Sequence, residues 1–271
     1  MKTDLLSQIK IKFEKIYRSI ENFSDEEILR GEKDLFSPHL EHLNRIAAMD
    51  VDDHLAEILL EDTGFQSMIS RIARVKRLNS IRIEAQQVQS VLQSVRPWET
   101  LAGFGYYPNY LKLAQMEYQG ADLTPGDRVA FLGSGPLPLS LILLCKSYDI
   151  DGVGIELETE NVALSRDLIE KLDLDQRIRI LQGNHLAFPL ENDCQLIMIG
   201  AEALPKDEIF SHLAQVLSPC TKLSYRIFEK GLRRLLDDHS VFRLPHLFKE
   251  YKRVRPQPPV NNTVVFIIKE K

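Results

Sequence analysis

The segment RVAFLGSGPLPL, residues 128–139, decides the fold expected for this chain. An apolar run, Arg128–Leu132, passes directly into Gly133-Ser134-Gly135-Pro136, and further apolar residues follow at once. Glycines permit backbone conformations and close approaches that other residues do not, so the segment predicts a β-strand, a ligand-binding turn and then a helix. Pro138 stands where a dinucleotide fingerprint needs its third glycine. The segment therefore disfavours NAD as the ligand.

Downstream of this segment, short apolar runs alternate with stretches of helical period. The expected strands are Arg128–Leu132, Gly152–Glu156, Arg177–Leu181, Gln195–Ile199, Lys222–Ile227 and Thr263–Ile268. The expected helices are Leu137–Tyr148, Glu160–Leu172, Lys206–Leu217 and Gly231–Asp237. Such alternation predicts an α/β domain with a parallel sheet covered on both faces.

Upstream of the segment, the sequence is typical of helices only. Apolar residues from Leu5 to Phe23 recur every three or four positions, which predicts an amphipathic helix. Further helix starts are expected at the capping box Ser24-Asp25-Glu26-Glu27, at Ser37-Pro38 and at Asp50. A long helix is expected from about Phe65 to Val95, where neither glycine nor proline occurs. We therefore expect an all-helical domain over residues 1–120 and the α/β domain over residues 121–271.

Composition narrows the classes of partner. The 271 residues carry 34 Lys+Arg against 39 Asp+Glu, a net charge of −5, which disfavours nucleic acid and anionic membranes as partners. No apolar run approaches the length of a membrane span, and the N-terminus lacks the uncharged core of a secretory signal, so a cytoplasmic location is expected. Three widely spaced cysteines favour neither a disulfide framework nor zinc. Apolar faces in the first 60 residues are compatible with packing within one chain or in a homodimer.

Two polar residues follow later strands at positions that suit a nucleoside. Glu156 ends the second strand about 20 residues after the glycine turn, where a carboxylate accepts hydrogen bonds from both ribose hydroxyls. Asn184 follows the third strand and offers its amide oxygen to an adenine amino group. S-Adenosylmethionine has that ribose and no phosphate, and is the expected ligand. The alternative is that Gly133 and Gly135 form only a tight turn and Glu156 is a solvated helix cap.

Two segments of the sequence are more distinctive than a general fold pattern. One is PWETL with GYYPNY, residues 97–101 and 105–110, and the other is VAFLGSGPLPL, residues 129–139. Both resemble the nicotianamine synthases. The resemblance extends from about Arg77 to Thr263. It implies a helical N-terminal cap domain, a Rossmann-like S-adenosylmethionine-binding domain, and S-adenosylmethionine as a co-substrate. The implied reaction moves the 3-amino-3-carboxypropyl group of S-adenosylmethionine onto an amine and releases methylthioadenosine.

The same resemblance implies that Glu84 is the general base and that Tyr110 is its partner. Glu84 also lies at the edge of an apolar stripe, where burial raises the pKa of a carboxyl group. The alternative is a boundary residue paired with Arg77 or Arg82.

Five further residues are candidates for substrate binding. Tyr106 and Tyr107 offer cation–π contacts to a cationic substrate, although tyrosines at such positions also pack in domain interfaces. Arg226 ends a strand and suits a substrate carboxylate, and Asn261-Asn262 precede the last strand.

Each of the polar candidates has a structural alternative. Arg226 has Glu229 and Asp207 as alternative partners, and Asn-Asn is also a common turn composition. His185 is expected to be a loop residue, and no catalytic metal is expected.

The sequence leaves two other functions open. One is an S-adenosylmethionine-dependent methyltransferase, because a fold does not determine which carbon of the sulfonium is attacked. The other is a non-catalytic adenosyl-ligand sensor. For the transferase, the acceptor is an amino-acid amine, and S-adenosylmethionine itself, an aminocarboxypropyl intermediate, glutamate and histidine all qualify. The product would be a nicotianamine-like or opine-type metallophore, or its precursor.

Overall fold

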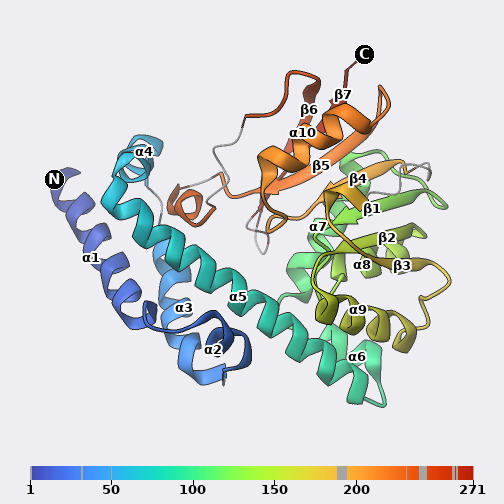
Figure 1. Cartoon of the computed structure of the whole chain (residues 1–271), viewed down its shortest axis with the longest axis horizontal. Helices are drawn as coiled ribbons and strands as arrows, with labels where there is room; N and C mark the ends of the chain where they lie inside the picture. The colour runs from blue at the N-terminus through green and yellow to red at the C-terminus, as the bar shows by residue number, and fades with distance from the viewer. Residues whose placement is uncertain are drawn as a thin grey trace. The chain divides into compact units, whose positions relative to one another are not determined.

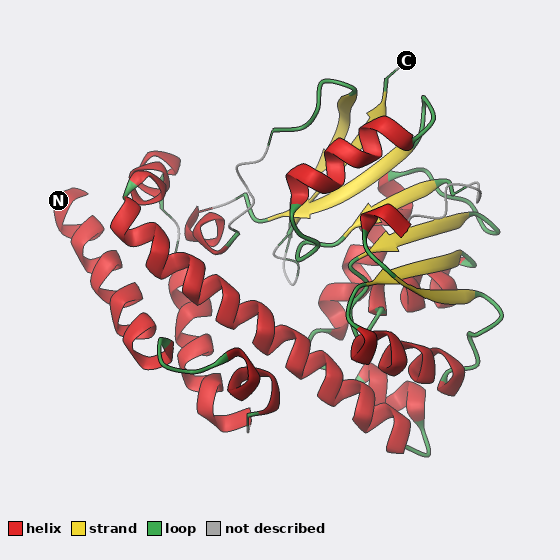
Figure 2. Cartoon of the chain, viewed as in Figure 1, coloured by secondary structure: helices red, strands yellow, loops and turns green. Residues whose placement is uncertain are grey.

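A computed structural model describes residues 2–31, 33–49, 51–187, 194–229, 231–237, 243–257, 260 and 262–270. Helices form the N-terminal part of the chain, and one mixed sheet with its helices forms the rest (Figures 1 and 2). The helices are α1 Lys2–Ile20, α2 Asp25–Arg30, α3 Lys33–Ala47, α4 Asp53–Glu61, α5 Thr63–Gln93, α6 Pro97–Ala102, α7 Tyr107–Gly120, α8 Leu139–Tyr148, α9 Thr159–Lys171, α10 Lys206–Val216, and the 3-10 helices η1 His185–Ala187 and η2 Gly231–Leu236. The strands are β1 Arg128–Leu132, β2 Asp151–Glu156, β3 Ile178–Gln182, β4 Leu196–Ile199, β5 Lys222–Ile227, β6 Phe248–Val254 and β7 Thr263–Lys269.

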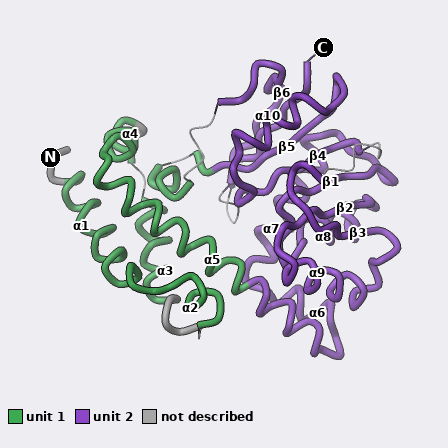
Figure 3. The backbone as a smooth tube through the Cα atoms, in the orientation of Figure 1, with its two compact units in different colours: residues 1–83, 228–241 green, residues 84–227, 242–271 purple. Residues whose placement is uncertain are grey.

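The chain divides into two compact units at positions other than the expected boundary at residue 120. One unit comprises residues 1–83 and 228–241, and the other comprises residues 84–227 and 242–271 (Figure 3). Helix α7 belongs with the sheet because it packs on it: a Cβ placed on Gly120 would lie 2.0 Å from the ring of Phe266. Helix η2 belongs with the N-terminal helices because Leu232 and Leu235 are buried in their apolar core.

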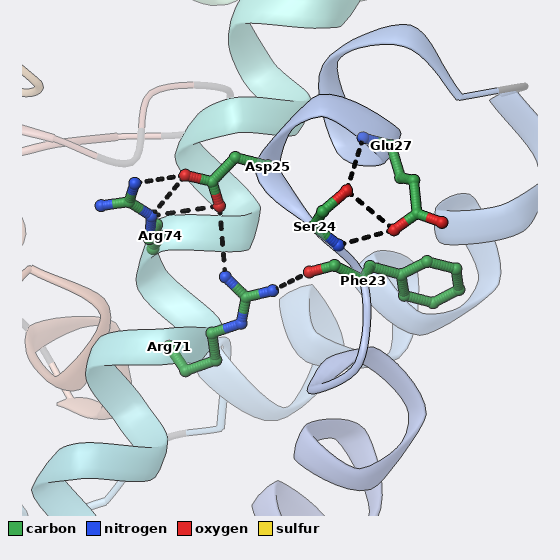
Figure 4. Close-up of polar contacts among 6 residues, drawn as sticks. All are labelled: Phe23, Ser24, Asp25, Glu27, Arg71 and Arg74. Atoms are coloured by element: carbon green, nitrogen blue, oxygen red, sulfur yellow. Dashed lines mark hydrogen bonds and ion pairs between the residues drawn. The ribbon is translucent and has the colours of Figure 1, made fainter.

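The capping box at Ser24 forms as the sequence predicts (Figure 4). The Ser24 N–H donates to Glu27 Oε2 at 2.7 Å, and the Glu27 N–H donates to Ser24 Oγ at 3.2 Å. The same first turn is tied to α5, since Arg71 and Arg74 both donate to the Asp25 carboxylate. These hydrogen bonds fix α2 against a helix that is remote in sequence.

Two helix starts differ from the prediction. Helix α3 begins at Lys33 and contains Pro38, so Ser37-Pro38 is not its start. Pro38 is the sixth residue of this helix, beyond the four N–H groups that lack an intrahelical partner, so one hydrogen bond of the ladder is absent there. Asp50 lies outside the described residues, and α4 begins after Asp52, whose Oδ1 accepts from the Leu55 N–H at 2.8 Å.

The sheet has seven strands in the order β3-β2-β1-β4-β5-β7-β6. The first five are parallel, while β7 pairs antiparallel with β5 and β6 with β7. The expectation of a wholly parallel sheet is therefore wrong at this edge. Strand β6 was not predicted because FKEYKRV is rich in charge, a composition that suits an exposed edge strand.

Successive side chains of each strand point to opposite faces of the sheet. Residues such as Ala130, Ile197 and Leu223 pack with α10 on one face. Ser224 and Arg226 lie on the other face, where they contact side chains of α7 and α8. The α/β class and its Rossmann-like layering are thus confirmed, and α7 brings a helix from outside the βα alternation onto the sheet.

Candidate active site

The parallel strands end along one edge of the sheet, called the carboxyl edge below. The glycine turn follows β1 there, Glu156 ends β2, and a short loop containing Glu202 follows β4. Antiparallel β7 begins at the same edge, because Thr263 pairs with Ile227 at the end of β5. Ligands of open α/β sheets bind at this edge, so these segments form the candidate site.

The glycine turn is shaped by Gly133 and Gly135, which have φ angles of +74° and +70°. Only glycine adopts this left-handed region without strain. A Cβ on Gly133 would lie 2.9 Å from the Cβ of Ala203, and a Cβ on Gly135 would lie 3.1 Å from Glu84 Oε2. The turn is therefore approached closely by two other segments, and one of them carries a carboxylate.

The middle and end of this turn are buried at Ser134 and Pro136. Among the described residues, Ser134 Oγ has no hydrogen-bond partner although Ser134 is only 4% exposed. A buried hydroxyl without a partner is costly, and this one lies in the turn that the sequence predicts to contact a ligand.

Glu156 is buried, with 7% of its surface exposed. Its Oε2 accepts from the Gly135 N–H at 2.8 Å, and its Oε1 accepts from the Glu158 N–H at 3.1 Å and from Asn161 Nδ2 at 3.3 Å. The carboxylate thus joins the glycine turn to the start of α9 and is not a solvated cap. A carboxylate has about four lone-pair directions, so capacity for a hydroxyl donor remains.

Glu84 and Tyr110 come together from α5 and α7. The Tyr110 hydroxyl donates to Glu84 Oε1 at 2.8 Å. The pKa of Glu84 is raised from 4.5 to about 7: desolvation is the largest cause, the charges of Glu202 and Glu156 also raise it, and the hydrogen bond from Tyr110 opposes them. Burial and the neighbouring Glu84 raise the pKa of Tyr110 well above its usual value. A carboxyl group with a pKa near 7 suits general-base chemistry.

Neither alternative partner, Arg77 or Arg82, forms an ion pair with Glu84. Arg82 instead donates to the Gly31 carbonyl at 2.9 Å and to Asn79 Oδ1. Within the described residues, Glu84 is paired with Tyr110 and with no cation.

Glu202 is a site residue that the sequence analysis missed. It lies in the loop after β4, it is exposed, and its charge acts on both Glu84 and Tyr110. The feature of the sequence that could have identified Glu202 is its position three residues after an apolar strand, which is comparable to the position of Glu156 at the end of β2. Three carboxylates therefore surround the glycine turn, an arrangement that favours a cationic ligand.

Arg226 forms a buried ion pair with a residue that the sequence did not indicate. Its Nε lies 3.1 Å from Glu117 Oε1 on α7, and its Nη2 donates to Ser140 Oγ at 2.8 Å. The other Glu117 oxygen accepts from Ser224 Oγ at 2.5 Å. The expected alternative partners Glu229 and Asp207 are therefore wrong. The signal for Glu117 was weak, because its partner is 109 residues away.

Asn184 and His185 occupy the loop after β3. Asn184 is exposed, and its Oδ1 accepts from the Leu186 N–H at 2.9 Å, which makes a local turn. The His185 ring lies 5.5 Å from that of His212 on α10, and burial lowers the pKa of His185. The described residues contain no group of three or more His, Cys, Asp or Glu arranged for a metal ion.

The remaining candidates differ in exposure. Tyr106 is 50% exposed and lies edge-on to Phe104 at 5.4 Å, while Tyr107 is partly buried, which raises its pKa. Asn262 is 9% exposed, and its Nδ2 has no hydrogen-bond partner in the described chain. Asn261 lies outside the described residues.

Among the residues that the structure describes, no helix is both long enough and apolar enough to cross a membrane.

A covered sheet with a glycine turn after its first strand and an acidic residue ending its second defines a Rossmann-like domain of the adenosyl-binding class. The comparisons with known proteins narrow this class. The chain belongs to the nicotianamine synthase family, because the family model described as "Nicotianamine synthase protein" matches residues 5–271. The resemblance seen in the sequence is thereby confirmed.

Related sequences and solved structures agree with this assignment. The chain is similar to nicotianamine synthase 9 of Hordeum vulgare, with 29% identity over 59% of this chain and 51% of that protein. It is also similar to nicotianamine synthase 1 of Arabidopsis thaliana, with 33% identity over 51% of this chain and 46% of that protein. The chain thus spans about half the length of the curated relatives that it matches.

Solved structures of MtNAS match nearly all of the chain, among them the following two. One is a Glu-to-Gln mutant of MtNAS in complex with S-adenosylmethionine, with a TM-score of 0.85, 27% identity, and coverage of 97% of this chain and 98% of that one. The other is MtNAS in complex with MTA and tNA, with a TM-score of 0.80, 26% identity, and coverage of 99% and 98%. The N-terminal helices are included in both matches.

Proposed function

We propose that this protein is a transferase that moves the 3-amino-3-carboxypropyl group of S-adenosylmethionine onto the amine of an amino-acid acceptor and releases methylthioadenosine. The observation that carries the proposal is the pairing of Glu84 with Tyr110 beside Gly135. A base with a pKa near 7 has no use in binding alone, whereas deprotonation of an amine is what this transfer requires.

In the proposed reaction, Glu84 accepts a proton from the acceptor amine. The nitrogen lone pair then forms a bond to Cγ of the methionyl side chain. The Cγ–S bond breaks, and its electron pair stays on sulfur, so the sulfonium becomes the neutral thioether of methylthioadenosine. Tyr110 holds the Glu84 carboxylate in one orientation through its hydrogen bond, which favours the geometry for proton transfer.

The adenosyl end of the substrate fits the other side of the glycine turn. Gly133, Ser134, Gly135 and Pro136 provide a surface close to the backbone, and the Ser134 hydroxyl has no hydrogen-bond partner among the residues that the structure describes. We assign the ribose hydroxyls to Glu156, which retains lone-pair capacity, and the adenine amino group to Asn184.

The carboxylate of a substrate has a proposed place on the α7 face of the sheet. Arg226 pairs with Val264 in the register, and Asn262 lies two residues before Val264, so both side chains fall on this face. Asn262 Nδ2, which has no hydrogen-bond partner in the described part of the chain, supplies a donor there. Tyr106, Tyr107 and Asn261 stay candidates for contacts to the acceptor.

We propose a nicotianamine-like metallophore, or its precursor, as the product. The relative MtNAS has been crystallised with S-adenosylmethionine and with MTA and tNA, which supports this choice of donor and product class. A cytoplasmic location, the absence of a nucleic-acid partner and a homodimer stay predictions from the sequence.

The nucleoside by-product tests the proposal. Purified protein would be incubated with S-adenosylmethionine alone and together with glutamate or histidine, followed by chromatography and mass spectrometry. We expect methylthioadenosine and an adduct enlarged by one or more aminocarboxypropyl groups. S-Adenosylhomocysteine as the main by-product would instead indicate a methyltransferase, and tight binding without either by-product would indicate a sensor.

A further inference from the structure

Glu202 is an exposed carboxylate on a loop whose backbone is unusually well fixed. Lys206, at the start of α10, is 1% exposed and donates to three carbonyl oxygens of this loop: Gly200 at 3.1 Å, Ala201 at 2.9 Å and Ala203 at 3.2 Å. An ammonium has three donors, and a buried one is tolerated when they are satisfied. These three hydrogen bonds fix the backbone of the loop that carries Glu202.

The same loop packs directly on the glycine turn. A Cβ on Gly200 would lie 3.0 Å from the Gly133 carbonyl oxygen, and a Cβ on Gly133 would lie 2.9 Å from the Cβ of Ala203. Since Glu84 Oε2 approaches Gly135 in that turn, Glu202 and Glu84 flank the same four-residue segment.

Glu202 differs from the other two carboxylates of the site in its partners. Glu156 accepts three hydrogen bonds and Glu84 accepts one from Tyr110. Across the described part of the chain, Glu202 takes part in no hydrogen bond or ion pair. A carboxylate that is fixed through its backbone and free at its oxygens is suited to bind a cation from solution.

We propose that Glu202 binds the ammonium group of the acceptor; this inference rests on the proposed function. The order of strands at the carboxyl edge separates two ends of the site, because β1 and its glycine turn lie between β2 with Glu156 and β4 with the Glu202 loop. A donor whose ribose is bound at Glu156 extends toward the turn. The acceptor then enters on the β4 side, where Glu202 receives its ammonium beside Glu84.

Titration provides a readout that a merely structural residue would not change. The charged and titratable groups that face Glu84 are Tyr110 from α7, Glu156 from β2 and Glu202 from the loop after β4, and Arg226 from β5 acts on Tyr110. Because the negative charge of Glu202 raises the pKa of Glu84, removing that charge lowers this pKa. The acid limb of the kcat/KM profile would therefore shift to lower pH.

The test compares Glu202→Gln with Asp207→Asn, which removes one negative charge from the exposed first turn of α10. Methylthioadenosine release would be followed over pH 5.5–9 with the acceptor that supports turnover, and methylthioadenosine binding would be measured by calorimetry. For Glu202→Gln we expect about a tenfold rise in the acceptor KM, the acid limb at lower pH, and unchanged methylthioadenosine affinity. Asp207→Asn should leave all three quantities unchanged.

Two results would overturn the assignment of Glu202. One is a Glu202→Gln protein with the KM and acid limb of the unaltered protein, and the other is an equal loss of methylthioadenosine affinity, which would place Glu202 at the donor. Glu202→Asp is a second variant that retains the negative charge. Its acceptor KM should stay close to that of the unaltered protein, which tests the role of the charge even where Glu202→Gln folds poorly. Absence of methylthioadenosine release from the unaltered protein with every acceptor would instead contradict the proposed function.

Discussion

Replacement of Glu84 by glutamine should lower the rate of turnover without weakening the binding of S-adenosylmethionine. It should also abolish the acid limb of the pH–rate profile. Glutamine keeps the size of the side chain and its hydrogen bond with Tyr110, but it does not accept the proton of the acceptor amine. We expect the affinity for S-adenosylmethionine to persist while kcat falls on the order of 10²–10⁴-fold, the usual contribution of a general base.

The pKa of Glu84 determines the size of the pH effect. With a pKa of about 7, about 90% of the carboxyl groups are ionised at pH 8 and about 10% at pH 6, whereas an ordinary glutamate is almost fully ionised at both. The base is active only when ionised. The rate of the unaltered protein should therefore fall about tenfold between pH 8 and pH 6, and the profile of Glu84→Gln should lack this limb.

The assay is methylthioadenosine release under saturating S-adenosylmethionine, with binding measured by calorimetry at each pH. Tyr110→Phe is the second variant: because the Tyr110 hydrogen bond lowers the pKa of Glu84, its loss should move the acid limb to higher pH with a smaller fall in rate. A Glu84→Gln protein with a near-normal rate would remove Glu84 from the mechanism. An acid limb of the unaltered protein near pH 4.5 would contradict the desolvation argument.

Two further predictions concern residues on either side of this pair. Glu156→Ala should weaken binding of S-adenosylmethionine and methylthioadenosine by about 1.5–3 kcal/mol, since both carry the ribose whose hydrogen bonds to a charged acceptor are lost; unchanged calorimetric affinity would show that the ribose lies elsewhere. Arg226→Met should lower the free energy of unfolding by about 3–5 kcal/mol in urea titrations, because it leaves Glu117 buried without its cation. The control Arg253→Met removes a partly exposed ion pair with Glu250 and should cost at most about 1 kcal/mol; similar losses in the two variants would contradict the assigned importance of burial.

Local pattern was sufficient for most of the secondary structure. The capping box at Ser24, the long helix α5 and six of the seven strands were predicted because each depends on residues within one element. Strand β6 was missed because its high content of charged residues is typical of an exposed edge strand and not of a buried one. Pro38 misplaced a helix start because Ser-Pro is typical of an N-cap and its first helical residue, whereas this proline is the sixth residue of α3.

The division into units and the polar partners depended on contacts between distant segments. Helix η2 returns to the N-terminal helices, and α7 packs on the sheet, although neither placement is visible in the local sequence. The sequence offered Glu229 and Asp207 as alternative partners of Arg226, whereas its actual partner, Glu117, lies on α7. An ion pair is specified by the distance between two atoms in space, which no local pattern encodes.

By itself the sequence determined the α/β class, the glycine turn with Glu156 after it, and, through resemblance, the pair Glu84 and Tyr110. These follow from residue types at short, regular spacings, because strand and helix periods and the conformational freedom of glycine are local properties. The tertiary structure alone decided that Glu84 lies against Gly135, that desolvation and two other carboxylates raise its pKa to about 7, and that Glu202 belongs to the site. Burial and electrostatic fields depend on everything that surrounds a group, so they arise only when segments from α5, α7, β2 and the loop after β4 meet.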